Sequence, residues 1–351
     1  MSPTQNKLEL TGSRQFVSWL TEHQISLSFS TYQAGKLFFI GLSDSQQLSV
    51  FERTFARCMG IGQDPQTQSL WVASLFQIWR FENALKPGQT HQGYDRVYVP
   101  QVGFTTGDVD AHDIAVDQQG PVFVNTLFSC LARPSERYSF KPFWMPPFIS
   151  KLAAEDRCHL NGLALKNQQP AYVTCVSQTD ANEGWREHRQ AGGVVIDVQN
   201  DEIIADGLSM PHSPRWYQDR LWVLNSGLGE FGFVDLESGR FEPLAFCPGY
   251  LRGMSFHGDF ALVGLSKPRR NQSFEGLALQ QHLESKNVKP RCGLQVINLK
   301  TGDIVHELRI EGAVEELYDV CVLADVKRPM AIGFVKDEIR HTLSLPDSNS
   351  Q

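Results

Sequence analysis

Three histidines recur at equivalent positions in three successive units of this sequence. The segments that contain them are AHDIAVD (111–117), CHLNGLAL (158–165) and MPHSPRW (210–216). Each segment is followed, after a polar or proline-containing turn, by a second short apolar run. The spacing is 47 residues from His112 to His159 and 53 residues from His159 to His212. Units of this length, built from short apolar strands and turns, are typical of a β-propeller.

The same pattern indicates how many blades to expect. Innermost strands are expected to start near Met59, His112, His159, His212, Arg252 and Tyr318. Six blades of about 40–50 residues account for nearly all of the 351 residues. The last unit holds only two strands, so we expect strands within 27–56 to complete it and close the ring, which removes exposed sheet edges. We therefore predict an all-β, six-bladed propeller; the alternative is seven blades, with 27–56 as a blade of its own.

Three segments make up the expected domain organisation. Residues 1–26 form an N-terminal arm with a short amphipathic helix, for which Ser13 is the expected N-cap. Residues 27–345 form a single β-propeller domain, and residues 346–351 form a disordered polar tail. Within the propeller, a helical insertion is expected at 274–283.

One segment inside the first histidine unit departs from the repeat. Residues 132–149 include the run FKPFWMPPF, whose prolines remove backbone donors and fix φ, so we expect no regular structure there. An aromatic segment of this length is either a lid over one face of the propeller or a surface that docks a protein partner. Both interpretations stay open at this point.

The charge balance and the cysteines limit the classes of partner and compartment. A formal net charge of −7 argues against a nucleic acid or an anionic membrane as partner. No run reaches the roughly 18 apolar residues that cross a membrane, and residues 1–10 lack the apolar stretch of a secretory signal. Seven cysteines without CxxC pairs fit reduced thiols. We therefore expect a cytoplasmic protein that binds neither nucleic acid nor membrane.

The three histidines are the strongest candidates for chemistry. Equivalent inner-strand positions of a propeller converge on one central channel, so His112, His159 and His212 are expected to lie near one axis. Neutral imidazole is the commonest protein metal ligand, and we predict one divalent transition metal, with iron, copper and zinc all open. Asp110 shares a strand face with His112, and its carboxylate is expected to accept the second ring N–H of a ligand histidine and so fix its tautomer. The plainer interpretation is three polar residues bonded to water and backbone.

Charged residues of the remaining inner strands supply the expected catalytic groups. Glu316 and Asp319 are candidates for a fourth ligand or a general base, and both face inward only if their strand begins between them. Arg252 is a candidate for binding a substrate carboxylate or phosphate. The alternative is that Arg252 pairs with Glu316 or Asp319 and only neutralises the channel.

Three further residues are expected to contact a substrate. Asn161 comes two residues after His159, so it faces the same side of the strand and is placed to orient a ligand or a water. Arg215 lies at a strand end where a substrate enters, although a solvated charge is the plainer interpretation of it. Trp144 comes from the aromatic segment.

The sequence resembles an uncharacterised family of bacterial "conserved hypothetical" β-propeller proteins, some of which are fused to tetratricopeptide repeats. The likeness lies in AHDIAVD (111–117), CHLNGLAL (158–165), MPHSPRW (210–216) and YLRGMSF (250–256), and it covers nearly the whole sequence. It implies a fold and no activity. More loosely, HLNGLAL is similar to a strand of six-bladed gluconolactonase-like metalloenzymes, with Asn161 at their metal-binding asparagine; histidines stand here where those enzymes use carboxylates.

These observations lead to two functional hypotheses of different classes. The first is a metal-dependent enzyme, a lyase, hydrolase or oxidoreductase, that acts on a small polar or peptide-like substrate at a three-histidine site. The alternative is a non-catalytic propeller that docks a protein partner through residues 132–149. An enzyme of the first kind requires a bound metal, whereas the second predicts an exposed aromatic surface.

Overall fold

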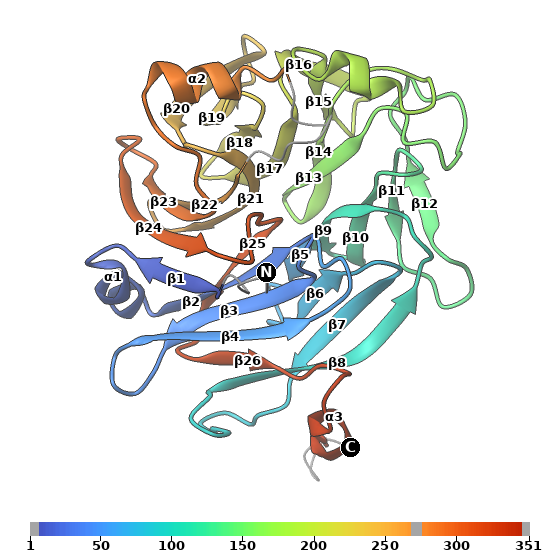
Figure 1. The fold of residues 1–351 in the computed structure, drawn as a ribbon. Helices are drawn as coiled ribbons and strands as arrows, with labels where there is room; N and C mark the ends of the chain where they lie inside the picture. The colour runs from blue at the N-terminus through green and yellow to red at the C-terminus, as the bar shows by residue number, and fades with distance from the viewer. Residues whose placement is uncertain (1–6, 268–275, 346–351) are drawn as a thin grey trace, which may run out of the picture.

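Six sheets stand around a common axis in residues 7–267 and 276–345, which the structure, a computed structural model, describes (Figure 1). The innermost strands contact one another in an unbroken circle. In order they are β5 (Ile61–Gln63), β9 (Ala111–Asp117), β13 (Leu160–Lys166), β17 (Pro211–Tyr217), β21 (Tyr250–His257) and β25 (Val320–Ala324). The predicted six-bladed β-propeller is therefore confirmed.

Three antiparallel strands continue each blade outward from its inner strand. In three blades they are β2 (Ile25–Thr31), β3 (Lys36–Leu42) and β4 (Leu48–Thr54); β6 (Leu70–Ala73), β7 (Gln77–Asn83) and β8 (Arg96–Thr105); and β10 (Gly120–Asn125), β11 (Cys130–Arg133) and β12 (Lys141–Trp144). In the other three they are β14 (Gln169–Cys175), β15 (Gly193–Asp197) and β16 (Glu202–Leu208); β18 (Arg220–Asn225), β19 (Glu230–Asp235) and β20 (Arg240–Phe246); and β22 (Phe260–Ser266), β23 (Gly293–Asn298) and β24 (Ile304–Glu311).

The ring is closed by pairing the two ends of the described chain. The late strand β25 pairs with the early strand β2, so that Val322 lies opposite Leu27, and β3 and β4 complete the same sheet. The strands within 27–56 therefore finish the last unit, as predicted, and the seven-bladed alternative is wrong. Two outer edges carry a fifth strand: β26 (Pro329–Ala331) runs parallel to β8, and β1 (Glu9–Gly12) runs antiparallel to β24.

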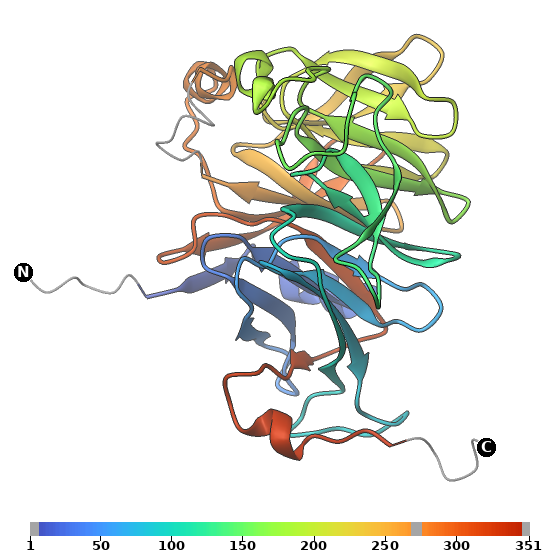
Figure 2. The ribbon, with the colours of Figure 1, turned by 90° about the vertical axis from the view of Figure 1, so that its right-hand side faces the viewer.

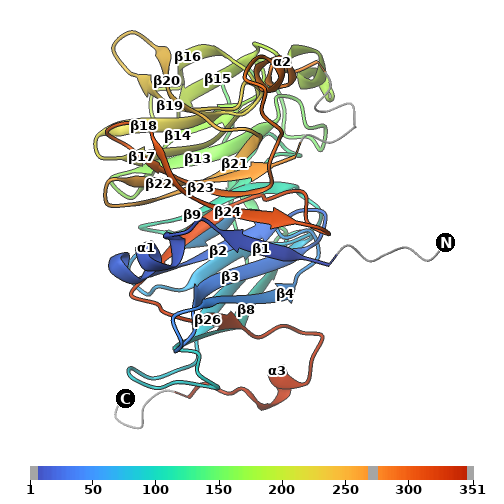
Figure 3. The same cartoon turned by 60° about the vertical axis from the view of Figure 1, so that its left-hand side comes forward.

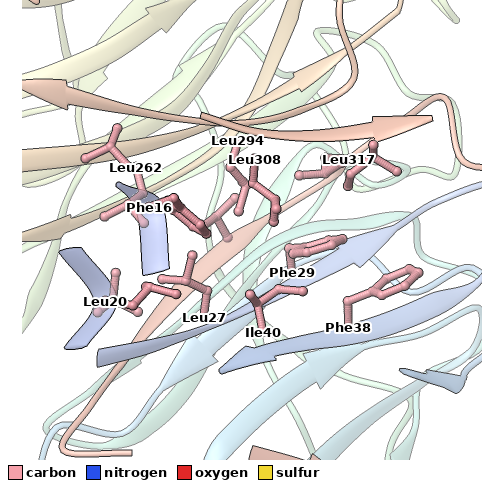
Figure 4. Packing of buried hydrophobic residues seen from close by; sticks show 14 of the residues in the cluster. Phe16, Leu20, Leu27, Phe29, Phe38, Ile40, Leu262, Leu294, Leu308 and Leu317 are labelled. Carbon is pink, nitrogen blue, oxygen red and sulfur yellow. The ribbon is translucent and has the colours of Figure 1, made fainter. Parts of the chain in front are cut away.

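The predicted N-terminal helix, α1 (Phe16–His23), fills the seam between the first and last blades (Figure 3). Its Phe16 and Leu20 are buried and face Leu27 and Leu262 of the two blades (Figure 4). Burying side chains of this size contributes about 1.5–3 kcal/mol each. The predicted N-cap is wrong: Ser13 lies before the helix, and its hydroxyl contacts His306 of β24 at 3.3 Å.

Several short elements lie outside the blades. The 3₁₀ helix η1 (Gly184–His188) precedes β15, α2 (Leu279–Ser285) precedes β23, and α3 (Glu338–His341) follows β26 at the far end of the molecule (Figure 2). The expected helical insertion therefore starts later than predicted; residues 274 and 275 lie outside the described residues, as does the predicted tail at 346–351. None of the described helices is long and apolar enough to cross a membrane.

The aromatic segment 132–149 is partly regular, contrary to the prediction. Lys141–Trp144 forms β12, the edge strand of its blade, which pairs with Leu131 and Ala132 of β11. Pro142 has no backbone N–H to donate, and an edge strand tolerates this loss. Some of the apolar side chains of this segment are packed against the core, and others are exposed. Phe140 and Met145 pack against neighbouring core clusters, whereas Tyr138 and Phe143 are exposed.

Hydroxyl groups hold the start of each of four inner strands to the preceding blade. In every case a Ser or Thr of the second strand, or of the residues just after it, donates to a backbone carbonyl where the next blade begins. The pairs are Ser30 to Met59 (2.5 Å), Thr126 to Leu160 (2.5 Å), Ser226 to Leu251 (2.7 Å) and Ser266 to Leu317 (2.9 Å). Because three of these carbonyls belong to neighbours of His159, Arg252 and Tyr318, the bonds fix residues that lie near the axis.

Candidate functional site

Six side chains form an arc around the axis at the end where the inner strands begin; we call them the axial cluster. They are His159, His112, Tyr318, Arg252, Tyr250 and His212, in the order in which they touch. The ring centroid of His112 lies 4.8 Å from that of His159 and 5.6 Å from that of Tyr318. The guanidinium carbon of Arg252 lies 4.9 Å from the Tyr318 ring and 5.3 Å from the Tyr250 ring. The ring centroids of Tyr250 and His212 are 5.6 Å apart. The three repeat histidines are thus brought to one end of the ring, from three different blades.

Two of the histidines are held by the backbone that leads into their strands. Asp110 and Met210 both have a positive φ, 51° and 49°, although neither is glycine. This conformation turns the carbonyl of each toward the histidine two residues later, so Nδ1 of His112 donates to Asp110 (2.9 Å) and Nδ1 of His212 donates to Met210 (2.8 Å). The Thr126 hydroxyl, which donates to a carbonyl of the next blade, also accepts from His112 Nδ1 at 2.8 Å.

The third histidine is held by a carboxylate instead. Asp156 lies 2.9 Å from Nδ1 of His159, and the same carboxylate accepts from the indole Nε1 of Trp185 at 2.8 Å. The Trp185 ring also stacks on the imidazole, with 4.1 Å between centroids. Although burial disfavours its charge, the contact with His159 lowers the pKa of Asp156 below its usual value. Asp156 is therefore ionised and fixes the orientation of the ring.

These contacts decide which ring nitrogen is free. A carbonyl or carboxylate only accepts, so Nδ1 of each of the three histidines carries a proton, and Nε2 keeps its lone pair wherever the imidazole is neutral. None of the three Nε2 atoms has a hydrogen-bond partner among the described residues, and that of His212 is fully buried. Burial lowers the pKa of His112 to about 4, and burial together with the Arg252 charge lowers that of His212 well below its usual value. Both imidazoles are neutral at pH 7.

The Arg252 guanidinium lies between the rings of Tyr250 and Tyr318. Its Nη1 is 3.5 Å from Oε1 of Glu316, which is buried, so of the two pairing partners considered for Arg252, Glu316 is the one it contacts. That separation exceeds the 2.7–2.9 Å or so of a short charge-assisted hydrogen bond. The Nε atom of Arg252 and the hydroxyl of Tyr318 are buried without a hydrogen-bond partner in the described part of the chain.

A second ionic cluster lies one layer further along the inner strands. Arg215 of β17 reaches two blades away to Asp113 of β9, at 2.7 Å and 3.1 Å, and two blades the other way to Asp319, at 3.7 Å. The three residues come from alternate blades, so they lie around the axis at roughly equal intervals. Asp113 also accepts from the backbone of Leu163, and Asp319 from that of Ile61. This ionic layer joins the blades and occupies the axis beneath the axial cluster.

The structure brings some of the predicted site residues together and separates others. Asp110 lies beside His112, with 3.6 Å between carboxylate and Nδ1, and also pairs with Arg57. Asn161 is buried, accepts from Thr174 through its carbonyl oxygen, and has a buried Nδ2 without a partner among the described residues. Asp319 and Arg215 belong to the lower ionic layer rather than to the histidines.

Trp144 is not near the axis. It lies on β12, the outermost strand of its blade, where its indole donates to Asp201 at 2.7 Å. The sequence reasoning also missed Asp156, Trp185 and Tyr250, which contact two of the histidines directly. The one sequence signal for these contacts was Asp156, an acidic residue three positions before His159.

No group of three or more His, Cys, Asp and Glu side chains that could hold a metal ion is present among residues 7–267 and 276–345 as they stand. The seven cysteines are buried and free, which is consistent with the expected reduced thiols. The metal at His112, His159 and His212 therefore stays a prediction. The observation that bears on it is that Nδ1 of each histidine has a hydrogen-bond partner.

Comparisons with known proteins agree on the fold and leave the activity open. A family model described as "Domain of unknown function (DUF4915)" matches residues 14–332, and no curated protein matches the chain. Among solved structures, a chain of a nidogen/laminin complex is 12% identical with a TM-score of 0.53, over 86% of this chain and 99% of that one. A protein of unknown function from Bacteroides caccae is 10% identical with a TM-score of 0.50, over 85% and 98%. Neither the family description nor these structures supports the likeness to gluconolactonase-like enzymes or a link to tetratricopeptide repeats.

Proposed function

We propose a metal-binding function for this chain, which belongs to the DUF4915 family, a domain of unknown function. One divalent transition metal is bound through the Nε2 atoms of His112, His159 and His212, and the site acts on a small polar or peptide-like substrate. Family membership assigns no activity, so the proposal rests on the side chains of the axial cluster.

The observation that supports the proposal most directly is that Nδ1 of all three histidines has a hydrogen-bond partner. Metal-bound histidines almost always donate their other ring nitrogen to a carbonyl or a carboxylate, which fixes the tautomer and raises the basicity of the ligand. The backbone of Asp110 and Met210 and the carboxylate of Asp156 meet this requirement. The lowered pKa values of His112 and His212 also keep protons from competing for Nε2 at pH 7.

The buried Nε2 of His212 supports an occupant independently. A buried polar atom without a partner costs about 1–3 kcal/mol, and such atoms call for a water, an ion or a ligand. Metal binding requires each Nε2 to lie about 2.0–2.1 Å from the ion.

Three neutral imidazoles leave open positions on a metal, where zinc would activate water for hydrolysis or elimination and iron or copper would support redox chemistry. The protein's own contribution is to orient the ligands and to exclude water from below through the Arg215 layer. Arg252 lies along the arc from His212 and is the cation available to a substrate. Glu316 lies 3.5 Å from that cation and offsets its charge.

Elemental analysis of untagged protein, purified and reconstituted with each of the three metals, tests the proposal. We expect about one equivalent of one metal, lost in His159→Ala. His257→Ala is the matched control, because His257 lies at the other end of inner strand β21 and should leave the metal content unchanged. Absence of metal after reconstitution, or equal retention by both variants, contradicts the proposal.

The exposed side chains of Tyr138 and Phe143 support the alternative, docking of a protein partner at residues 132–149. Loss of a co-purifying partner in Phe143→Ser, with metal absent from the wild type, would favour this alternative. Retention of the partner in that variant would contradict it.

A further inference from the structure

A second group of histidines lies at the seam between the first and last blades. His23 is the last residue of α1, and its ring meets that of His257, at the end of β21, edge-on with 5.1 Å between centroids. The ring of Trp19, one helical turn before His23, lies 5.0 Å from the His23 ring and 5.7 Å from that of His306 on β24. We call His23, His257 and His306 the seam histidines.

The seam histidines lie where the ring is closed. Gln24, the residue after His23, accepts at its carbonyl from the backbone N–H of Asp325 at 2.9 Å, directly after the closing strand β25. The next residue, Ile25, begins β2 and pairs with Ala324 of β25. Helix α1 therefore leads without a linker into the strand pair that closes the ring (Figure 3).

The carboxylates around the seam histidines offer little to balance a positive charge there. Asp259 lies two residues after His257 and Glu307 one residue after His306, and both already pair with basic side chains. These partners are Lys300 for the aspartate and Arg291 and Arg309 for the glutamate. Glu22 is exposed on α1. Asp325 is the carboxylate whose charge favours protonation of His257.

The docked helix therefore resists protonation of the two histidines that it covers. Burial lowers the pKa of both His257 and His306 below the usual value of about 6.5, and the charge of protonated His23 lowers both further. Well above that value both imidazoles are neutral whether α1 is docked or released. As the pH falls below about 6.5, the released chain takes up protons that the docked seam resists, so docking weakens with acid.

The apolar side of α1 limits how far the helix is released. Phe16, Trp19 and Leu20 are buried in the seam and hold the helix against both blades (Figure 4). Their burial does not depend on pH, so α1 stays docked in most molecules. Acid then increases the small fraction of molecules in which the helix is released.

We propose that α1 is a pH-sensitive closing element of the ring, which neutral seam histidines keep docked and protonated seam histidines release. Release frees the start of β2 and so loosens its pairing with β25. The inference goes beyond the proposed metal centre and does not depend on it. His257 lies at the opposite end of β21 from Tyr250 of the axial cluster, and His306 lies on an outer strand.

Hydrogen exchange of the full-length protein, followed by mass spectrometry, measures the release of α1. Exchange is compared at about pH 7.5 and about pH 5.5, on either side of the usual histidine pKa, after correction for the intrinsic pH dependence of amide exchange. We expect the amides of Phe16–His23 to lose protection at the lower pH. The amides of β13 and β14, in a blade away from the seam, are expected to keep theirs.

Three variants test the role of the seam histidines. The double variant His257→Gln, His306→Gln cannot be protonated at these positions and is expected to lose no α1 protection at the lower pH. Asp325→Asn removes the carboxylate that opposes the effect, so its loss should exceed that of the wild type; asparagine tolerates the φ of 57° at this position. His91→Gln, in the exposed loop between β7 and β8, is the control and should match the wild type.

The proposal is overturned if α1 keeps the same protection at both pH values in the wild type. It is also overturned if the double variant loses as much protection as the wild type, or if β13 and β14 lose protection in parallel with α1, since the effect would then belong to the whole ring. Loss confined to α1 and the ring closure, absent from the double variant and larger in Asp325→Asn, supports it.

Discussion

Replacing Arg215 with glutamine removes the cation that lies between two buried carboxylates from other blades. Asp113 and Asp319 are each about 3% exposed and approach the guanidinium at 2.7 Å and 3.7 Å. Without Arg215 both carboxyl groups stay buried at the axis with no cation beside them. The ionic layer joins three alternate blades, so its loss should destabilise the whole ring rather than one blade.

The magnitude follows from the geometry. At 2.7 Å the attraction between Arg215 and Asp113 is about 6 kcal/mol at an effective dielectric constant of about 20. Desolvation of the charges offsets part of this attraction, and removing one partner of a buried pair typically costs about 3–5 kcal/mol. The Arg215 side chain is 21% exposed, which favours the lower end, about 3 kcal/mol.

Urea unfolding followed by tryptophan fluorescence measures this loss. Arg291→Gln is the control, because the Arg291–Glu307 pair has the same 2.7 Å separation while its arginine is 38% exposed; it should cost less than about 1 kcal/mol. Adding Asp113→Asn to Arg215→Gln should recover at least about 1 kcal/mol, since one carboxylate is then neutral. The reasoning is refuted if Arg215→Gln loses no more stability than Arg291→Gln.

Three other predictions concern the same inner strands. Burial and the nearby Asp113 raise the pKa of Asp319 to about 7, so the folded protein holds the carboxyl proton of Asp319 more tightly than the unfolded chain does. The stability that this proton contributes is lost as the pH rises from about 4 to about 7. Urea midpoints across this range should therefore fall less in Asp319→Asn than in the wild type. Thr126→Val removes the hydrogen bond to the Leu160 carbonyl and should cost about 1–3 kcal/mol in the same assay, whereas Thr21→Val, at an exposed position of α1, should cost almost nothing. Asp156→Asn should weaken metal binding by about 10–100-fold with little loss of stability, and unchanged affinity in a competition titration would contradict the role assigned to Asp156.

The repeat pattern was sufficient to predict the ring. His112, His159 and His212 each begin an apolar run whose partner strand follows after a short turn, and such local pairing depends on residues that are close in sequence. Closure was also predictable, because the last unit lacked strands that residues 27–56 could supply. Pairing of Arg252 with Glu316 was one of two alternatives that the sequence left open.

Contacts that depend on distant or irregular segments were not predictable. Arg215 meets Asp113 across 102 residues and two blades, and nothing near either residue indicates that pairing. Trp185 reaches His159 from a short 3₁₀ helix whose position is set by tertiary packing. Ser13 had the features of an N-cap but contacts β24 instead, because the helix packs into the seam between the blades. Prolines in 132–149 suggested irregular structure, yet an edge strand tolerates them.

The central claim is that three imidazoles with engaged Nδ1 atoms bind one metal through Nε2. An anomalous-difference map from crystals soaked in Zn²⁺, collected on both sides of the zinc absorption edge, tests this most directly. The account predicts one strong peak on the axis, about 2.0–2.1 Å from the Nε2 atoms of His112, His159 and His212. A map without a peak there, or with zinc only at surface histidines such as His257, would contradict it.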